Sequence, residues 1–298
     1  MNESTFAEGS LFPEFERFVK ENDLLNRLKS GALGPKIHRI IGQGTTRASG
    51  IDLPPAPIER KKELIGLILP PEIALPDAVQ AEIAQVRQDV DLFFDELRKP
   101  EGVRRLAAQV LRELERQGVA TGYRDNCFYA EKLILVPRGR GESWSWSLTR
   151  HYSIVGNLPP DPSYLVQGFE AARKRLKELL VPVEEFDSKL VLAWELAKHF
   201  SREGEVFLVD VARLFKVAGQ SDLFWKTPMK RLFRDLPEAC FLANLLAWRR
   251  YKGPGKTRFE FVQATLHQAH GPGARVFFMP TNDEGTQTNP VVYIRKVA

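Results

Sequence analysis

The strongest constraint on the fold is an ordered series of short amphipathic segments near the C-terminal end of the chain. Apolar side chains recur at three- and four-residue spacing in 188–200 and again in 205–219, which predicts two consecutive helices. After a polar turn, Thr227 is a suitable N-cap, and Pro228 suits a first helical position because its missing N–H is not needed there. A third helix is therefore expected from this point to Pro237, which ends it.

A β-hairpin with a charged tip is expected directly after this third helix. The segments "CFLANLLAWRRY" (240–251) and "RFEFVQATLHQ" (258–268) are the expected strands, and "KGPGKT" (252–257) is the tip. A turn needs the glycines and the proline, but its geometry does not require positive charge. The basic side chains of the hairpin are Arg249, Arg250, Lys252, Lys256 and Arg258, and those at the third helix are Lys226, Lys230, Arg231 and Arg234. Further short strands are expected at 275–280 and 291–296.

Two helices, a basic third helix and a hairpin with a basic tip follow one another in the order of a winged helix-turn-helix domain. Residues 187–268 resemble such a domain, and their arrangement is similar to the winged helices of bacterial plasmid replication initiators, in which two such domains occur in tandem. The resemblance covers about a quarter of the chain and rests on element order, not on a diagnostic motif. It implies that the cationic third helix reads base edges in a major groove while the flexible wing grips phosphates.

The remainder of the chain is expected to be mainly helical, with one further hairpin. Helices are predicted at 11–29, 77–98, 102–117 and 163–180, whereas 30–57 is rich in Gly, Pro, Ser and Thr and is interpreted as a linker or irregular arm. The run 127–155 predicts a hairpin with Arg138 and Arg140 at its tip and with Trp144 and Trp146 packed in a core.

These elements predict an α+β fold that is mainly helical with β-hairpins and ends in a winged helix-turn-helix. A second winged helix is possible in the N-terminal half, although no third helix is evident there. Four segments are expected: an N-terminal helix and irregular arm (1–60), helices with a β-hairpin (61–157), a connecting helix (158–185) and a winged-helix domain (186–298).

The location of the charge supports an interaction with a polyanion. The chain has a net charge of +5, which is mildly basic for 298 residues. Residues 222–298 hold 12 basic and 6 acidic side chains, and residues 101–150 hold 9 and 6, so the positive charge is concentrated in the two blocks that contain the predicted hairpins. Basic residues at a hairpin tip also protect strand edges from pairing. This second interpretation is the stronger one for Arg138 and Arg140, whereas nucleic-acid contact is the stronger one for 252–258.

Other functional classes have little support in the sequence. Cys127 and Cys240 are far apart with no C-x-x-C spacing, and His151, His199, His267 and His270 show no metal-ligand pattern, so neither a metal site nor another cofactor is predicted. No nucleophile elbow or supported carboxylate pair is present, and an enzyme is not expected. The N-terminal residues lack a signal-peptide pattern and no apolar run approaches a membrane span, which predicts a cytoplasmic protein without a membrane partner.

Two functions remain open. The favoured one is a double-stranded DNA-binding protein of the replication-initiator or regulator type, with a site made of Lys226, Thr227, Lys230, Arg231, Arg234, Arg250, Lys252, Lys256 and Arg258 together with Arg138 and Arg140. The alternative is a scaffold or nucleic-acid-gripping subunit of a larger bacterial complex, such as a chromosome-organising or phage-defence machine, whose winged helices bind other protein subunits. Neither the target sequence nor the oligomeric state follows from the residues.

Overall fold

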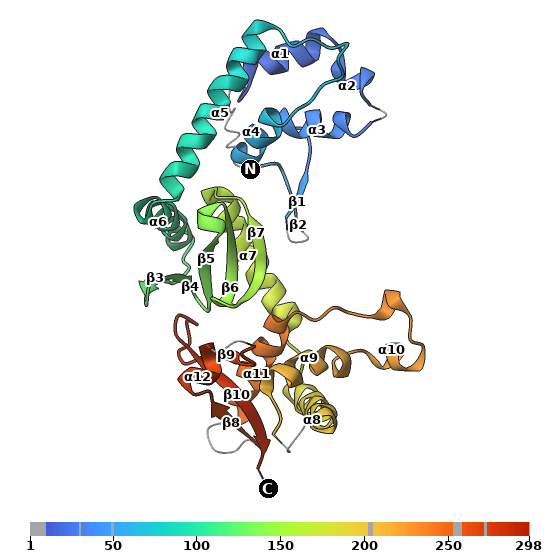
Figure 1. The fold of residues 1–298 in the computed structure, drawn as a ribbon, viewed down its shortest axis with the longest axis vertical. Helices are drawn as coiled ribbons and strands as arrows, with labels where there is room; N and C mark the ends of the chain where they lie inside the picture. Colours follow the sequence, from blue (N-terminus) through green and yellow to red (C-terminus); the bar gives the residue numbers. More distant parts are fainter. Residues whose placement is uncertain are drawn as a thin grey trace. The chain divides into compact units, whose positions relative to one another are not determined.

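The computed structural model describes residues 10–29, 31–48, 51–201, 205–252, 258–270 and 273–297 and shows a mixed α+β protein (Figure 1). Its residues fall into two compact units. The first holds the chain up to Glu113 together with Pro137–Ser145 and Gly156–Gly168; the second holds Leu114–Val136, Trp146–Val155 and the chain from Phe169 onward. The predicted α+β class is confirmed at this level.

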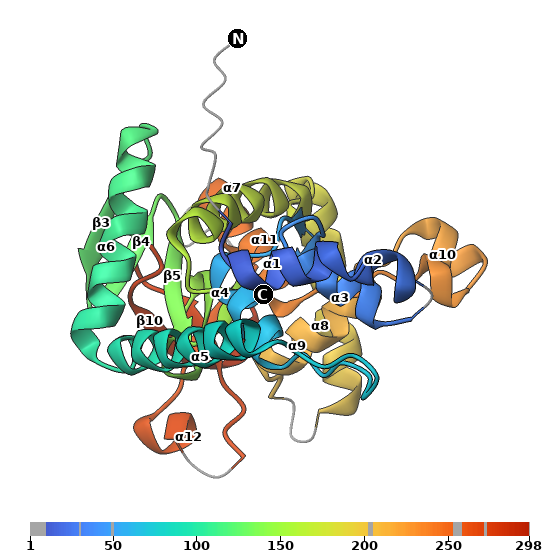
Figure 2. The same cartoon turned by 90° about the horizontal axis from the view of Figure 1, so that it is seen from above.

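The first unit is built on one long helix. Its helices are α1 (Pro13–Glu21), α2 (Leu24–Arg27), α3 (Leu33–Ile40), α4 (Pro57–Ile65), α5 (Asp77–Leu97), the larger part of α6 (Pro100–Arg116) and the start of α7 (Pro162–Leu179). The Glu82 carboxylate of α5 accepts hydrogen bonds from the backbone N–H groups of Glu14 (3.1 Å) and Phe15 (2.9 Å), so it satisfies two free donors at the start of α1. Phe15 and Phe94 are buried in the core of this unit, and α5 and α6 meet at a sharp bend (Figure 2).

Two expectations for the N-terminal segment are corrected. The single helix expected at 11–29 is two helices, because the chain turns at Asp23, whose φ of 49° lies in the left-handed region. The segment 30–57, expected to be irregular, contains α3 and the short antiparallel strands β1 (Thr46–Ala48) and β2 (Ile51–Leu53). The helix α3 forms because Ile37 and Ile40 bury one face and the proline lies in its first turn, where it removes no helical hydrogen bond.

A five-stranded antiparallel meander follows α6. Its strands are β3 (Thr121–Arg124), β4 (Cys127–Ala130), β5 (Leu133–Arg138), β6 (Ser143–Thr149) and β7 (Tyr152–Leu158), in that spatial order. The predicted hairpin is confirmed, since β5 and β6 are joined by the short turn η1 (Gly139–Gly141). Trp144 and Trp146 are fully buried, which confirms their predicted core role, and Trp146 meets Phe169 of α7 (Pro162–Leu179) edge to face at 5.1 Å.

The rest of the second unit combines helices with a three-stranded sheet. Its elements are α8 (Val183–Phe200), α9 (Leu208–Ala218), α10 (Asp222–Lys226), η2 (Lys230–Leu232), α11 (Glu238–Lys252), β8 (Phe259–Gln263), α12 (Leu266–His270), β9 (Phe277–Pro280) and β10 (Thr288–Lys296). The strand β10 is central and pairs with both β8 and β9. Phe207, just before α9, forms an isolated bridge with Tyr293 of β10. Phe186, Phe215 and Phe241 bring α8, α9 and α11 together, with ring centroids 5.3 to 6.1 Å apart.

The expected third helix at 227–237 is not formed. Only the 3-10 turn η2 lies there, and Met229 and Phe233 on its two sides have extended backbones. Phe233 is 43% exposed, and no residue of η2 is buried. A short amphipathic segment is helical in a protein when its apolar stripe is buried against other elements, and the apolar residues of this segment are not buried.

The expected first strand of the C-terminal hairpin is also corrected, because residues 240–251 lie in the helix α11. Residues Ala239–Leu245 are all buried, so the segment has apolar neighbours on every side and its sequence carries neither a two-residue nor a 3.6-residue period. Its length and its Ala and Leu content favour a helix. Arg249, Arg250 and Lys252 therefore belong to the last turn of a helix and not to a hairpin tip.

Candidate nucleic-acid interface

The most exposed group of predicted site residues lies on a closed loop between α9 and α11, which we call the arm (residues 220–234). Figure 1 shows the arm as a long loop that extends away from α9 and α11, with α10 toward its outer tip. Its two ends are joined by Gln220, whose side chain donates to the Arg234 carbonyl (2.8 Å) and accepts from the Arg234 N–H (2.8 Å). Gln220 is 2% exposed and also donates to the Lys216 carbonyl. A loop whose ends are held together in this way is an Ω-loop, a class that is frequently functional.

Gly219 permits this closure at the base of the arm. A Cβ atom at Gly219 would lie 2.6 Å from the Leu236 side chain and 2.9 Å from the Phe215 carbonyl oxygen of the preceding turn, so a larger residue here would require Leu236 to move. The Lys216–Asp235 ion pair (3.6 Å) adds a contact beside it. The two ends of the arm are thus joined at its base by one buried amide, with an ion pair beside it.

Inside the arm, apolar and basic side chains alternate on the surface. Ser221 caps α10 by accepting from the Phe224 N–H (3.3 Å). The Phe224 ring is half-buried and meets Trp225 and Phe233 at 5.7 and 5.8 Å, both at steep interplanar angles. Leu223, Trp225 and Phe233 are 58%, 49% and 43% exposed. The predicted site residues of the same segment are also exposed; they are Lys226, Thr227, Lys230, Arg231 and Arg234.

The arm cations are not neutralised locally. Within the described part of the chain, none of Lys226, Lys230, Arg231 and Arg234 forms an ion pair with a carboxylate. Asp222 is the one acidic residue between the two ends of the clamp, and Asp235 is paired with Lys216 outside the arm. The arm therefore presents a net positive potential to solvent.

The predicted site residues at the end of α11 and beyond it lie apart from the arm, and those that the structure describes are largely engaged in contacts. Arg250 pairs with Asp283 at 2.5 Å, and Arg258 lies 3.5 Å from Asp187. Lys252 is the last residue of α11 and lies over the Tyr251 ring at 6.0 Å, while Lys256 falls outside the described residues. The arm leads into the first turn of α11, and a helix of this length separates its ends by roughly 20 Å. The arm cations and the cations at the end of α11 are therefore two separate groups.

Asp187 has a structural role. The helix α8 begins at Val183, and Asp187 lies inside it, 9% exposed. Its carboxylate accepts a hydrogen bond from the Trp248 indole N–H at 2.8 Å. Arg258 and Trp248 thus stabilise a nearly buried carboxylate, and Arg258 is not a free cation for a ligand.

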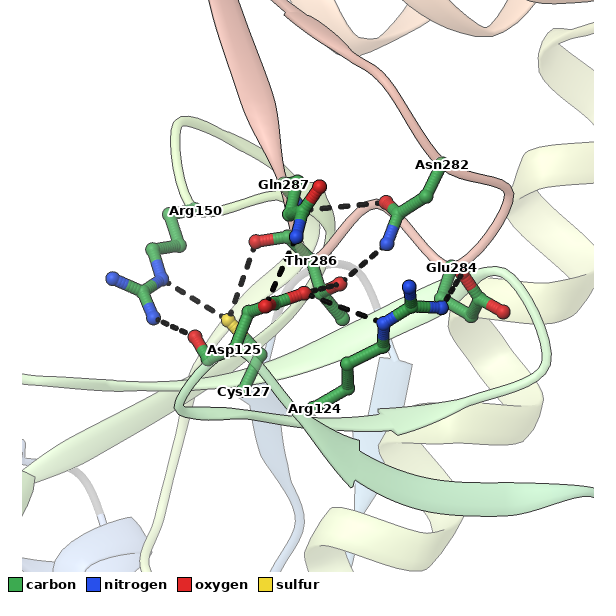
Figure 3. Close-up of polar contacts among 8 residues, drawn as sticks. All are labelled: Arg124, Asp125, Cys127, Arg150, Asn282, Glu284, Thr286 and Gln287. Atoms are coloured by element: carbon green, nitrogen blue, oxygen red, sulfur yellow. Dashed lines mark hydrogen bonds and ion pairs between the residues drawn. The ribbon is translucent and has the colours of Figure 1, made fainter.

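The hairpin loop between β9 and β10 is also engaged, as Figure 3 shows. Asp125, in the two-residue turn between β3 and β4, accepts from the side chains of Thr286 (2.9 Å) and Gln287 (3.0 Å). These hydrogen bonds, that of Gln287 first, lower the pKa of the Asp125 carboxyl group. Arg150 donates to the Asp125 carbonyl (2.7 Å) and to the Cys127 sulfur (3.0 Å). Since this loop also carries Asp283 and Glu284, it is both tied down and acidic.

The two remaining predicted residues, Arg138 and Arg140, are in the first unit. Both are exposed at the β5–β6 turn, where Arg138 donates to Ser145 (3.4 Å) and Arg140 has a left-handed φ of 58°. This turn lies against the end of α5, because a Cβ at Gly141 would be 3.1 Å from the Leu97 carbonyl oxygen.

The second unit also contains a groove of about 800 Å³. Its floor and walls are largely apolar, with Leu148 from β6, Leu176 and Leu180 from α7, Ala243, Leu246 and Ala247 from α11, and Met279 and Val291 from the three-stranded sheet. Lys132, Arg249 and Arg250 lie among its polar lining residues. The half-buried face of α11 therefore faces an apolar groove and carries no basic side chain before its last turn.

Several features were not found from the sequence. The clamp made by Gln220 and the exposed Trp225 carried no prediction, although "DLFWKTPMKRLF" (222–233) alternates aromatic and basic residues in a way that is typical of nucleic-acid contact. Among the described residues, no cluster of His, Cys, Asp or Glu is arranged to hold a metal ion, and no described helix combines the length and apolarity needed to cross a membrane.

Comparison with protein-family models finds no match, and neither does comparison with curated proteins or with solved structures.

Proposed function

We propose that this chain is a double-stranded DNA-binding protein that holds the phosphate backbone through the cations of the arm. The observation that carries the proposal is the closed, cationic arm, in which Lys226, Lys230, Arg231 and Arg234 are exposed and form no ion pair with a carboxylate of the described residues. Phosphate oxygens are the acceptors that such side chains bind best, and neutralising them releases counterions from the DNA.

The finer fold proposed for residues 183–297 is a winged helix with the arm inserted before its last helix. The order α8, bridge residue Phe207, α9, α11, β8 and β10 supports it, as does the central place of β10 between β8 and the Phe207 bridge. In this arrangement α11 corresponds to the recognition helix and the β9–β10 hairpin to the wing.

The surroundings of α11 and of the β9–β10 hairpin indicate how the chain would contact DNA. A helix that enters a major groove needs an exposed polar face, but α11 is buried from Ala239 to Leu245 and presents Leu246 and Ala247 to the groove. The β9–β10 loop is held by Asp125 and carries acidic residues. Recognition is therefore proposed to be through the backbone, with weak sequence preference.

The salt dependence of duplex binding tests this proposal. The double variant Lys230→Ala with Arg231→Ala removes two arm cations, so the slope of log affinity against log salt should become shallower by about 1.8, which is about 0.9 per phosphate contact. The matched control is Lys174→Ala with Lys177→Ala, which removes two exposed cations of α7 and should leave the slope unchanged. Equal slopes for both double variants and the wild type would refute a role for the arm cations in duplex binding.

A scaffold subunit is the second candidate, and the apolar groove favours it. Grooves of this kind accept the apolar face of a partner helix, and the exposed Leu223 and Phe233 of the arm add further apolar surface. If the chain binds no duplex at low salt but forms a stoichiometric complex with another subunit that the substitution Leu246→Asp disrupts, the scaffold function replaces the DNA-binding one.

A further inference from the structure

We propose that Trp225 stacks on an unpaired base, so that the arm binds DNA where a single strand is exposed beside duplex. The proposal rests on the proposed function and adds the class of DNA that the arm prefers. Its starting point is that the arm exposes an indole ring and a phenyl ring among its cations, which phosphate binding alone does not require.

The geometry of the aromatic cluster makes Trp225 available to a ligand. Phe224 lies between Trp225 and Phe233, but the interplanar angles of 77° and 61° show that neither ring is stacked face to face on it. Trp225 is 49% exposed, whereas the other tryptophans, Trp144, Trp146, Trp194 and Trp248, are at most 7% exposed. An indole face that is open to solvent on an anchored loop is suited to stacking.

The chemistry of the two DNA forms decides which ligand fits. In an intact duplex each base face is covered by its neighbours, so an indole reaches only sugar, phosphate and base edges. In a single strand the base faces are accessible, and stacking on an aromatic side chain stabilises the complex without regard to sequence. Lys226 follows Trp225 directly, and Lys230 and Arg231 lie a few residues further along, so phosphates that flank a stacked base have cationic partners. Since both kinds of contact are within one closed loop, the favoured ligand is an unpaired strand.

Fluorescence and affinity measurements on the full chain test the proposal. Three probes of equal strand length are used: an intact duplex, a single strand, and a duplex with a central unpaired bubble. Because the other four tryptophans are buried, stacking on Trp225 should quench the tryptophan emission with the single strand and the bubble and much less with the duplex. The variant Trp225→Phe should lose this signal and keep most of the affinity.

The variant Trp225→Ala should weaken binding to the single strand and the bubble by about fivefold to a hundredfold and leave duplex affinity nearly unchanged. Leu223→Ala is the matched control, because Leu223 is a similarly exposed apolar residue of α10 that cannot stack on a base. A similar loss in both variants would mean that general apolar contact is responsible and would overturn the stacking proposal.

The failures of the two proposals are distinguishable. If the duplex binds through the arm cations while Trp225→Ala has no effect on any probe, the stacking proposal is wrong and the proposed function stands. If none of the three probes binds at low salt, the proposed function is wrong as well. Unchanged denaturation midpoints of the Trp225 and Leu223 variants establish that the fold is intact, as expected for exposed positions.

Discussion

Replacing Gly285 with alanine tests how firmly the β9–β10 hairpin is held against β6. Gly285 has a φ of 74°, and a Cβ atom there would lie 2.0 Å from the Leu148 carbonyl oxygen. The left-handed backbone alone costs an L-residue about 1–2 kcal/mol. Since real Cβ atoms do not approach closer than 3.0 Å, the loop must also move by about 1 Å, and forcing such a shift in a packed contact costs about 1–3 kcal/mol. The expected loss is therefore about 2–5 kcal/mol.

Gly118 provides the matched control for this substitution. It has a φ of 80°, but no described atom lies within 4 Å of an added Cβ. Gly118→Ala should therefore lower the free energy of unfolding only by the cost of the left-handed backbone, about 1–2 kcal/mol. Urea unfolding followed by tryptophan fluorescence gives both values, with an unchanged denaturant slope as the sign that the unfolded states are comparable. Equal losses in the two variants would refute the close approach of the hairpin to Leu148.

Two other substitutions test the Gln220 clamp of the arm and the Asp125 turn between β3 and β4. Gln220→Ala removes the buried amide that joins the ends of the arm. It should lower the free energy of unfolding by about 1–3 kcal/mol and weaken duplex binding, although no charge is lost. Hydrogen-exchange protection that is retained at the Arg234 N–H in this variant would contradict the clamp. Asp125→Asn tests the acid limb of the stability curve. Because the folded-state pKa of Asp125 lies below its ordinary value of 3.8, its contribution is present above that value and is lost as the pH falls through the lower pKa. The Asp125→Asn variant should therefore lose less free energy of unfolding than the wild type as the pH falls into the acid range. Parallel curves of unfolding free energy against pH for the two proteins at acid pH would contradict this role of Asp125.

The helices that were predicted correctly combine a clear period with clear ends. In α5 and α6 apolar residues recur at spacings of three and four, and Gly118, which follows α6, has a positive φ that suits a residue just beyond a helix end. The β5–β6 hairpin was predictable for a similar reason, because two β-prone runs flank a glycine-containing turn. In each of these cases the local pattern and the tertiary packing favour the same structure.

The errors occurred where packing, and not local pattern, determines the structure. The helix α11 is buried on nearly all sides, and a segment in that environment keeps no polar face that would reveal its period. The segment 227–237 has a helical pattern and helix-start residues, yet its Phe233 contacts only the edge of the arm's own aromatic cluster and remains 43% exposed. Both outcomes depend on residues distant in the sequence, and a local window contains no information about them.

The candidate site was predicted by residue type but not by geometry. The predicted cations of 226–234 are exposed, as a ligand site needs, but they lie on a loop closed by Gln220. That closure is a side-chain to backbone contact across the loop, which no motif encodes. Arg250 and Arg258 were predicted as ligand contacts, but each has a carboxylate partner in the fold, Asp283 and Asp187 respectively.

The replacement of a helix by a loop changes the kind of recognition that these cations support. On a helix, residues 231 and 234 would be neighbours on one face at a fixed spacing, which is the arrangement that matches adjacent base edges in a major groove. On the arm, the backbone is extended at Phe233 between them, and no regular repeat sets the direction of either guanidinium group. A fixed spacing between side chains is what converts base contacts into sequence preference, whereas phosphate contacts need only proximity and charge. The same four cations are therefore expected to contribute affinity and salt dependence to DNA binding, and the arm's contribution to selectivity is expected to come from the accessibility of the bases and not from their order.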